Sequence, residues 1–489
     1  MSETNREIEL KFALTPEQRD AILERPECAD TIAVRRLVST YFDTADHALR
    51  RAGYTLRLRR ESGRWIQTVK SCAAGEGVVR GEWSAAAPRG RPDPALITCK
   101  PVADMLTGAD MTPLFTVDMT RRIVTLVNAR SRIELCLDEG EVRVADRVAP
   151  VLELELELKS GAPKTLLAYA RRLRDAHALR PAFVSKAERG FALFSPIGLE
   201  APRFAPAVIS REMRAHEAFA ATAYAALKHS VAQAERLRET PDAEAVHQLR
   251  VGARRLRSLI WIFKPITGDT QAARINRAWK HLASRLGPAR EIDVCLDGAF
   301  ALFDWRADAE ARDAVERRLR SVRKRAYARA HRAVEDDRFS ALVFETLSWI
   351  ESGRLSAPAR DEPITDFAGA SLDRARRRVA RRTKKFGRLE PQARHAARIA
   401  AKTLRYAAEA FGPLFDAHPK RRRRFLARVK TVLANLGDLN DLAVGRAVFG
   451  SPGPAPVLAW LGDRETSLMK ATKKSLRRFA KAERFWPRE

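Results

Sequence analysis

Carboxylates recur at every second position in two segments of the first half of the sequence. These segments are REIELKF (residues 6–12) and VLELELELK (residues 151–159). Alternate side chains of a β-strand point to the same face, so the acids of each segment would share a face. Carboxylate oxygens are the ligands that Mg²⁺ and Mn²⁺ prefer. The acids with this spacing are Glu7, Glu9, Glu153, Glu155 and Glu157.

Basic residues follow the same alternation on other segments. Arg57 and Arg59 share a face of TLRLRR, Lys70 lies on WIQTVK, and Lys11 continues the face of Glu7 and Glu9. Guanidinium and ammonium groups bind phosphate oxygens, arginine in bidentate fashion. Together the two sets predict a cage for a highly charged anion and a divalent cation. The alternative for any one strand is a solvated face, because exposed charge alternation is common.

The first 200 residues must position these side chains, and they read as a β-rich domain. Short alternating segments are separated by Gly, Pro and Asp/Ser clusters, which is typical of an antiparallel sheet. Helical patterns interrupt near residues 15–23 and 164–177, and Thr15 followed by Pro16 is a plausible helix start. A closed sheet is the natural way to point so many charges inward around a ligand.

The second half is rich in Ala, Leu and Arg, has helical periodicity and repeats internally. VHQLRVGARRLRS (residues 246–258) matches RHAARIAAKTLRY (residues 394–406), and KHLASRLGPAREID (280–293) matches KTVLANLGDLNDLA (430–443). Two matches in the same order, at offsets of 148 and 150 positions, predict a duplicated helical unit.

Each copy of the first repeated segment carries a cationic stripe. Helical residues at i, i+3, i+7 and i+10 fall within an arc of about 80°. The stripes are His247, Arg250, Arg254 and Arg257, and His395, Arg398, Lys402 and Arg405. A neutral histidine can still donate a hydrogen bond to phosphate. The alternatives are a solvated helix face and, for each histidine, a structural hydrogen bond to a neighbouring helix.

Charge and cysteine usage limit the classes of partner and compartment. The 489 residues carry a formal net charge of +29, which points to polyanionic partners. The five cysteines are scattered without a CxxC pair, as expected for reduced thiols in the cytoplasm. The N-terminal residues do not resemble a signal peptide, and no apolar stretch of about 18 residues predicts a membrane helix. We find no aromatic base-stacking platform, so we expect no specific nucleic-acid partner.

Four segments in the first half, taken in order, resemble the CYTH domain of the triphosphate tunnel metalloenzyme family. They are EIELKF, YFDTADHALRRAGYTLRLRR (residues 41–60), VLELELELKSG and FVSKAERGF (residues 183–191). The resemblance covers about residues 1–200. It implies an eight-stranded antiparallel tunnel that binds a triphosphate compound with a divalent metal, Mg²⁺ or Mn²⁺.

The same resemblance implies roles for individual residues. Glu7 and Glu9 would bind metal, with two of Glu153, Glu155 and Glu157 completing the set; the sequence leaves open which two. Glu82 and Asp138 would orient basic groups or a metal-bound water. Arg121 competes with Arg122 for the inward position, and Arg80 and Arg189 are further candidates. The expected phosphate-binding residues are Lys11, Arg57, Arg59, Lys70, Arg122 and Lys186.

The second half, about residues 211–481, resembles the CHAD domain through both histidine motifs and both Leu-Gly segments. The resemblance implies two four-helix bundles related by pseudo-twofold symmetry that bind inorganic polyphosphate on a basic surface. It extends that surface from the two stripes to Arg274, Lys280, Arg424 and Lys430.

The expected architecture is therefore a multidomain α+β protein. We predict a tunnel domain at residues 1–200, a linker at 201–210 and a helical domain at 211–485, with repeat units at about 211–350 and 364–485. The expected function is metal-dependent hydrolysis of inorganic triphosphate, with polyphosphate binding by the helices and a cytoplasmic location, including polyphosphate granules. The alternatives are a non-catalytic polyphosphate-binding protein and a triphosphatase for an organic triphosphate such as thiamine triphosphate or ATP.

Overall fold

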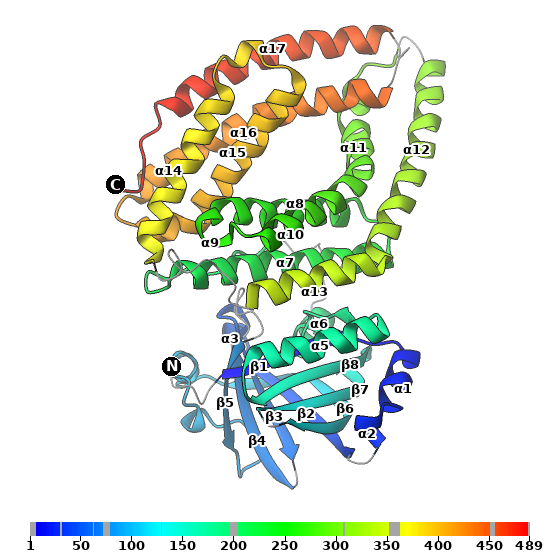
Figure 1. Ribbon diagram of the computed structural model, residues 1–489, viewed down its shortest axis with the longest axis vertical. Helices are drawn as coiled ribbons and strands as arrows, with labels where there is room; N and C mark the ends of the chain where they lie inside the picture. The colour runs from blue at the N-terminus through cyan, green and yellow to red at the C-terminus, as the bar shows by residue number, and fades with distance from the viewer. Residues whose placement is uncertain are drawn as a thin grey trace. The chain divides into compact units, whose positions relative to one another are not determined.

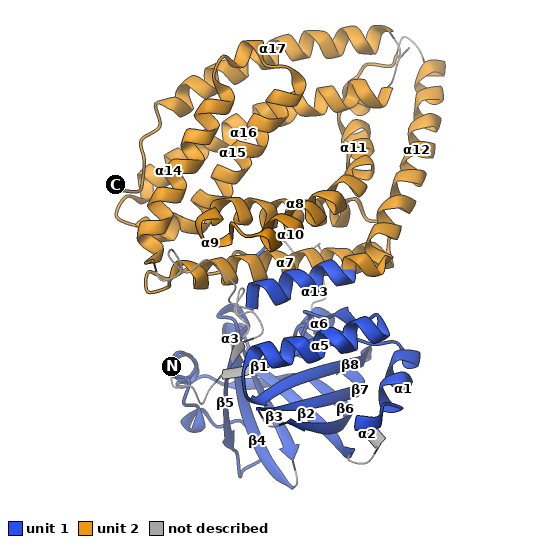
Figure 2. Ribbon diagram, in the orientation of Figure 1, with its two compact units in different colours: residues 1–205, 340–354 blue, residues 206–339, 355–489 orange. Residues whose placement is uncertain are grey.

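The structure is a computed structural model in which the chain forms two compact units, residues 1–205 with 340–354 and residues 206–339 with 355–489 (Figure 2). The linker predicted at 201–210 and the segment between the two predicted repeat units lie partly outside the described residues. The residues that the structure describes are 6–29, 32–61, 63–71, 79–128, 130–194, 204–306, 309–351, 362–449 and 455–487.

The first unit is built on one antiparallel sheet that closes on itself (Figure 1). Its described strands follow the order β5-β4-β3-β2-β6-β7-β8-β1-β9, and pairing of β5 with β1 closes the ring. The strands are β1 (Arg6–Ala13), β2 (Ala33–Thr44), β3 (Tyr54–Glu61), β4 (Arg64–Ser71), β5 (Val79–Ala86), β6 (Met111–Asn128), β7 (Ser131–Val144), β8 (Arg147–Ser160) and β9 (Arg180–Pro181). The sheet has nine described strands rather than the expected eight, because the two-residue β9 pairs with the end of β1.

Helices begin and end in this unit where the sequence provides caps. α1 begins after Thr15, whose hydroxyl accepts a hydrogen bond from the backbone N–H of Gln18 while the Gln18 side chain returns a bond to the Thr15 backbone. This reciprocal pair is a capping box. The helices of the unit are α1 (Pro16–Leu23), α2 (Pro26–Ala29), α3 (Ala48–Arg51), η2 (Pro94–Leu96), α4 (Lys100–Leu106), α5 (Pro163–His177) and α6 (Lys186–Phe194).

The apolar faces of the strands point away from the interior of the closed sheet. Leu56 and Val69 on β3 and β4 pack with Val102 and Leu106 of α4. On the other side, α5 packs on β8 and buries Leu166 together with other apolar residues of the same helix. Strand alternation therefore leaves the charged side chains inside the sheet and places the apolar core between the sheet and its helices.

A helix from late in the chain also belongs to the first unit. α13 (Asp337–Glu351) follows the long α12, and residues 340–354 group with the tunnel (Figure 2). The Phe344 ring stacks on Phe12 of β1 with centroids 6.2 Å apart, and the Ser340 hydroxyl donates a hydrogen bond to the Leu179 carbonyl. Both phenylalanines are almost completely buried. The outer face of β1 is thus covered by residues from the helical half of the sequence.

The second unit is helical throughout its described length, apart from short irregular connections and one isolated β-bridge. Its first half contains α7 (Ala215–Glu239), α8 (Ala243–Ile262), α9 (Lys264–Thr267), α10 (Thr270–Arg285), α11 (Gly287–Cys295), the π-helical turn η3 (Leu296–Phe300) and α12 (Ala309–Glu335). Its second half contains α14 (Ile364–Thr383), η5 (Phe386–Arg388), α15 (Pro391–Phe411), η6 (Gly412–Phe415), α16 (Pro419–Phe449) and α17 (Ala455–Ala480).

The internal repeat is visible in the helices but is not perfect. The two matched histidine segments lie on α8 and α15, which pack against each other and share a buried hydrogen bond between Ser258 and Thr403. α16 is continuous over 31 residues, whereas the corresponding α10 and α11 are separate helices that meet at Gly287-Pro288. Proline has no N–H to continue the helical hydrogen bonds, and Asp438 stands at the matching position of α16.

None of the helices in the described part of the chain is both long enough and apolar enough to span a membrane.

Candidate functional site

The closed sheet of the first unit surrounds a cavity of about 260 Å³ whose walls are mainly charged. The carboxylates that line it are Glu9, Glu61, Glu82, Glu134, Glu155 and Glu157. The cations that line it are Lys11, Arg35, Arg57, Arg59, Lys70, Arg121, Lys159 and Lys186. Tyr41, Leu37 and Met119 add an apolar strip from β2 and β6.

Strand register arranges the acids in rows. Glu9 on β1 lies directly opposite Glu157 on β8, and Glu157 lies opposite Glu134 on β7. Directly opposite residues of antiparallel strands have Cβ atoms about 4.5–5.5 Å apart. Three neighbouring strands therefore present carboxylates at the same level of the tunnel wall, within reach of a single hard cation.

The next row mixes charges. Lys11 lies opposite Glu155, and its ammonium is 2.7 Å from a Glu155 oxygen and 3.3 Å from a Glu9 oxygen. Cys136 on β7 lies on the other side of Glu155. Burial raises the pKa of the Cys136 thiol to about 12, so it faces the cavity as a neutral group at ordinary pH.

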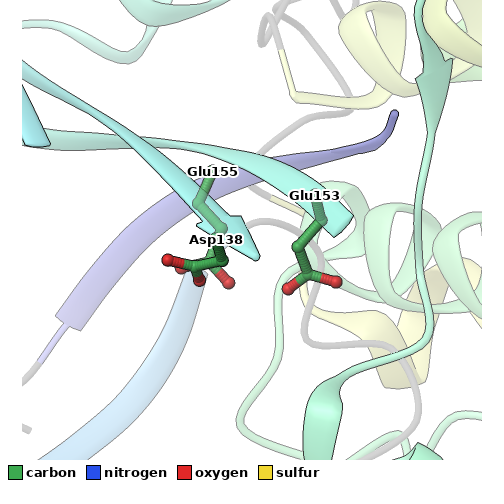
Figure 3. A group of neighbouring side chains, drawn as sticks. All are labelled: Asp138, Glu153 and Glu155. Carbon is green, nitrogen blue, oxygen red and sulfur yellow. The ribbon is translucent and has the colours of Figure 1, made fainter. Parts of the chain in front are cut away.

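A third, deeper row is the most acidic part of the unit. Asp138, Glu153 and Glu155 are all buried, and each offers an oxygen within 4.8 Å of the others (Figure 3). Such a cluster of hard oxygens could hold a divalent metal ion. In this structure, however, basic side chains already contact every one of the three carboxylates.

Lys186 at the start of α6 is the main counter-charge of this cluster. Its ammonium lies 2.6 Å from Asp138 and 2.9 Å from Glu155, and it also contacts Glu153. Arg121 donates a bidentate pair of bonds to Asp138 at 2.6–2.7 Å and one of 2.5 Å to Glu155. A metal at this position would have to displace or share these cations.

The electrostatics of the cluster follow from burial and opposing charges. Burial alone would raise the pKa of Glu155, but Lys11, Lys186 and Arg121 together hold it well below its usual value. Burial likewise opposes the charge of Lys186, but the surrounding carboxylates raise its pKa above the usual range. Glu155 and Lys186 are therefore both ionised near neutral pH.

The opposite wall of the tunnel is basic. Arg57 and Arg59 project from β3, and Lys70 projects from β4. Glu82 on β5 lies 3.2 Å from the Lys70 ammonium and 3.8 Å from Arg57, which fixes both cations over the cavity. Burial and then the neighbouring charge of Arg57 lower the pKa of Arg59 to about 10. A buried anion would relieve this repulsion between cations.

The structure places most of the predicted residues on the cavity wall but corrects one. Arg121 lines the tunnel, whereas Arg122 points to the opposite side of β6 and donates to Glu139 at 3.1 Å. Alternation along the strand explains why only one of the neighbours faces inward. Arg121 therefore replaces Arg122 in the candidate set. The predicted residues that do line the cavity are Glu9, Lys11, Arg57, Arg59, Lys70, Glu82, Glu155, Glu157 and Lys186.

Three other predicted positions lie elsewhere. Asp138 and Glu153 are fully buried behind Lys186, and Arg189 contacts Glu153 at 2.6 Å. The side chain of Glu7 and that of Arg80 lie outside the described part of the structure, although their backbones pair across β1 and β5.

Four charged residues of the cavity wall were not among the predicted site residues: Arg35, Glu61, Glu134 and Lys159. Glu134 was recognisable in the alternating segment RIELCLD, and Lys159 ends the acidic strand β8. Lys159 bridges Glu134 and Glu157 at 3.3 and 2.6 Å. Arg35 could have been found only from the strand pairing that sets it opposite Arg121.

The second unit holds a separate group of cations. The two predicted stripes lie on α8 and α15, which pack against each other. Burial, followed by the charge of Arg254 on α8, lowers the pKa of both Arg398 and Lys402 on α15, so the charge of Arg254 acts on both. We call the group of Arg250, Arg254, Arg290, Arg398 and Lys402 the cation cluster.

Few anions balance this cluster within the described residues. Glu291 on α11 and Asp438 and Asp441 on α16 are the carboxylates that act on its members. Arg250 is held by a hydrogen bond to the Ala283 carbonyl at 2.6 Å rather than by a carboxylate, and burial followed by Arg254 lowers its pKa to about 10. Half-buried cations that repel each other and have few counter-charges form a site for an anion.

The two histidines sit at the edge of the cluster in different settings. His395 Nδ1 lies 2.9 Å from the Asn440 side-chain oxygen and donates to it. At the matching position of the repeat, His247 faces Arg290 instead, and burial followed by this charge lowers its pKa to about 4. Both rings are neutral near pH 7, as burial also lowers the pKa of His395. Each can donate one neutral hydrogen bond.

The last residue of each stripe and the four predicted residues beyond the stripes lie outside the cation cluster. Arg257 donates to Asn276 at 3.1 Å, and Arg405 lies 3.3 Å from Glu409. Arg274, Lys280, Arg424 and Lys430 are exposed on α10 and α16, the helices that flank α8 and α15.

Arg290, Glu291, Asn440 and Asp441 were missed by sequence reasoning. They occupy matching positions of the two Leu-Gly segments, at an offset of 150, so the repeat itself carried the signal.

Comparison with protein families and known proteins agrees with this division. The CYTH domain model matches residues 5–191 and the CHAD domain model matches residues 221–450. An inorganic triphosphatase of Haemophilus influenzae is 28% identical over 206 residues, which are 39% of this chain and 55% of the relative. An uncharacterised protein of Mycobacterium tuberculosis is 29% identical over 215 residues, 42% of this chain and 39% of its own length. The chain thus spans about half of the curated relatives it matches, or less.

Solved structures resemble each half separately. The CHAD domain of the plant Ricinus communis is 23% identical, covers 58% of this chain and 94% of its own, and has a TM-score of 0.46. A Hippeastrum protein for which a dominant triphosphatase activity is described is 18% identical, covers 39% of this chain and 94% of its own, and has a TM-score of 0.30.

Proposed function

The chain consists of a CYTH domain followed by a CHAD domain, and we propose that it hydrolyses inorganic triphosphate to diphosphate and phosphate in the tunnel. The observation that carries this proposal is the separation of charge across the cavity. Four of the six lining carboxylates lie on β1, β7 and β8, and five of the eight lining cations lie on β2, β3, β4 and β6. A polyphosphate anion bound together with a divalent cation needs both walls at once.

We place the metal, Mg²⁺ or Mn²⁺, at the row formed by Glu9, Glu157 and Glu134, with Glu155 adjacent. These carboxylates line the cavity together with the lysines that contact them, Lys11 and Lys159, whereas Asp138 and Glu153 do not line it and are paired with Lys186 and Arg189. When bound, the metal would neutralise phosphate charge and supply an activated water. Hard oxygen ligands in this number fit Mg²⁺ or Mn²⁺.

The basic wall would do the remaining work. Arg57, Arg59 and Lys70 bind the phosphate chain and hold it straight for in-line attack on the terminal phosphorus. Arg121 and Lys11 stabilise the charge that grows on the diphosphate leaving group. Glu82 and Asp138 are positioning residues, because the first fixes Lys70 and Arg57 and the second fixes Arg121 and Lys186.

The size of the cavity favours a small substrate. A volume of about 260 Å³ with mainly charged walls suits a chain of three phosphates. Tyr41 is the aromatic residue among the described lining residues, so an organic base or thiazole ring would find little to stack on. This favours inorganic triphosphate over ATP or thiamine triphosphate.

A phosphate-release assay on the full chain tests the proposal. Glu9→Gln should reduce release from triphosphate by about 10²-fold or more, because a neutral amide removes one charge from the metal site. Glu139→Gln is the matched control, because Glu139 pairs with Arg19 and Arg122 on the outer face. Equal activity of Glu9→Gln and the control would overturn the metal assignment. Faster phosphate release from ATP or thiamine triphosphate than from inorganic triphosphate would overturn the proposed substrate assignment.

For the helical unit we propose binding of inorganic polyphosphate at the cation cluster. The supporting observation is the imbalance of charge, since Arg250, Arg254 and Arg398 repel each other with few carboxylates between them. Arg254→Ala combined with Arg398→Ala should weaken polyphosphate binding by at least about tenfold and leave triphosphate hydrolysis intact. Competition with DNA at fixed salt separates this proposal from general nucleic-acid binding, and stronger binding of DNA would overturn it.

A further inference from the structure

Lys402 is half-buried on α15, one helical turn from both Arg398 and Arg405 and next to Thr403, which contacts Ser258 of α8. Within the described residues it makes no hydrogen bond or ion pair. The groups that face its ammonium are His395, Arg398 and Arg405 on α15, His247 and Arg254 on α8, and Asp441 on α16. Asp441 is the one carboxylate among them. An ammonium in this setting loses water on burial and gains repulsion from its neighbours.

Both effects favour the neutral amine. Burial, and then the charges of Arg254, Arg398 and Arg405, lower the pKa of Lys402 to about 6. The residue is then largely uncharged above pH 7 when no anion is bound. Arginine at the same place would stay protonated at every pH of interest.

The two copies of the repeat differ in whether this position carries arginine or lysine. Arg254 of α8 follows His247 by seven positions, and Lys402 follows His395 by the same interval. One half of the pseudo-symmetric cluster therefore carries a fixed charge, and the other half carries a charge that can be removed. Lysine is the side chain whose pKa shifts readily on burial.

We propose that the cation cluster binds a polyanion together with a proton, and that Lys402 takes up this proton. The inference rests on the proposed binding of inorganic polyphosphate by the same cluster. An anion placed among Arg254, Arg398 and Lys402 replaces their repulsion with attraction. The protonated amine then becomes the favoured form, and the proton comes from the solvent.

Linkage gives the sign and the size of the effect. Between the pKa of the free protein and the higher pKa of the complex, the complex holds one proton more than the free protein. Affinity then falls by about tenfold for each pH unit of increase in this window. Below about pH 6 Lys402 is protonated in both states, so its contribution no longer changes with pH. His247 titrates below this window, because burial lowers its pKa to about 4, and burial also lowers the pKa of His395.

Isothermal titration calorimetry of the full chain with long-chain polyphosphate at pH 8 measures the proton directly. Repeating it in buffers of different ionisation enthalpy gives the number of protons taken up per site. We expect about one for the natural chain and for Lys474→Arg, an exposed control on α17. We expect about zero for Lys402→Arg, which is always charged, and for Lys402→Met, which is always neutral.

The outcomes separate the inference from the function on which it rests. Absence of binding by the natural chain would overturn the proposed polyphosphate site itself. Binding without proton uptake would overturn only the inference, and so would uptake that persists in both Lys402 variants. As a second measurement, the affinity of the natural chain should fall about tenfold per pH unit from pH 7 to 9, while Lys402→Arg stays flat. A parallel fall in both would assign the proton to another group.

Discussion

Replacement of Lys186 by methionine is the sharpest perturbation of the tunnel. The ammonium contacts Asp138, Glu153 and Glu155 in the buried end of the sheet. Methionine keeps much of the volume but removes the charge that these carboxylates share. Removing one partner of a buried ion pair costs about 3–5 kcal/mol, because the remaining charge is left without compensation.

The remaining contacts reduce this cost in the Lys186→Met variant. Glu155 keeps Lys11 at 2.7 Å and Arg121 at 2.5 Å, and Glu153 keeps Arg189 at 2.6 Å. We therefore expect the lower end of the range, about 3 kcal/mol. That free energy corresponds to a loss of roughly 10²-fold in the protection of β8 amides against hydrogen exchange.

The loss of stability in the Lys186→Met variant should depend on pH, and linkage gives the direction of that dependence. In the natural chain the folded-state pKa of Glu155 is depressed, so its contribution is complete above the unfolded pKa and is lost only as pH falls through the folded value. Between pH 5 and 8 it is therefore constant. Without Lys186 the pKa of the buried Glu155 rises, because Lys11 and Arg121 alone oppose the effect of burial, and stability falls with increasing pH once that pKa exceeds the unfolded value of about 4. The variant should lose more stability at pH 8 than at pH 5.

Hydrogen exchange read on peptides of β8 is the suitable assay, because a chain of two units does not unfold as one cooperative transition. Rates at each pH are compared after correction for intrinsic exchange. Lys159→Met is the control. Lys159 contacts Glu134 and Glu157 on the same face, but it is 35% exposed, so the loss should stay below about 1 kcal/mol. Equal losses in both variants, or no larger loss at pH 8 than at pH 5, would refute the reasoning.

Three further outcomes are expected. Phe344→Ala should cost about 3–5 kcal/mol in the protection of β1, because Phe12 loses its stacking partner, whereas the exposed Leu302→Ala should change stability by less than about 0.5 kcal/mol. Arg121→Lys should lower triphosphate hydrolysis by at least about tenfold, since lysine cannot donate a bidentate pair, and Arg122→Lys should not; the reverse order would restore the original assignment. Polyphosphate affinity should fall about 10²-fold between 50 and 200 mM salt if five cations contact phosphates, and a flat response would argue against charge neutralisation.

Periodicity was enough to predict most of the tunnel. Alternation placed Glu9 and Lys11 on one face and Leu10 and Phe12 on the other, and the structure agrees. It also set Glu155 and Glu157 together on the inner face of β8. Such predictions succeed because the two-residue period of a strand is a local property that needs no knowledge of its partners.

Periodicity could not predict how deeply a side chain is buried or which side chains of other elements contact it. Glu153 shares the face of Glu155, but only the position of Lys186, 33 residues later, shows that Glu153 lies behind the cavity. Arg121 and Arg122 are neighbours on one strand, so only one of them can face the cavity. A shift of the strand by one residue would exchange the side chains that face inward with those that face outward. The phase of β6 is fixed by its pairing with β7, where Arg121 lies opposite Asp138.

The helical half shows the same division between local and long-range information. The stripes of α8 and α15 were predictable from helical spacing, whereas a shared basic surface was implied only by the resemblance to the CHAD domain. Only the structure shows that His247 faces Arg290 whereas His395 bonds to Asn440, because this depends on which residue of α11 or α16 lies beside each histidine. The pKa of Lys402 depends on cations from two helices and was beyond the reach of a single segment.

The charged interior of the tunnel explains why the first unit needs a helix from the second half of the sequence. A sheet that lines its interior with ions has to bury its apolar residues on the outside, where helices must cover them. On β1, Glu9 and Lys11 face the cavity, while Leu10 and Phe12 face outward and are almost completely buried. Residues 340–354 provide part of that cover through Phe344. The strand that carries the proposed metal ligand is therefore covered on its outer face by Phe344 of α13, a residue of the same compact unit.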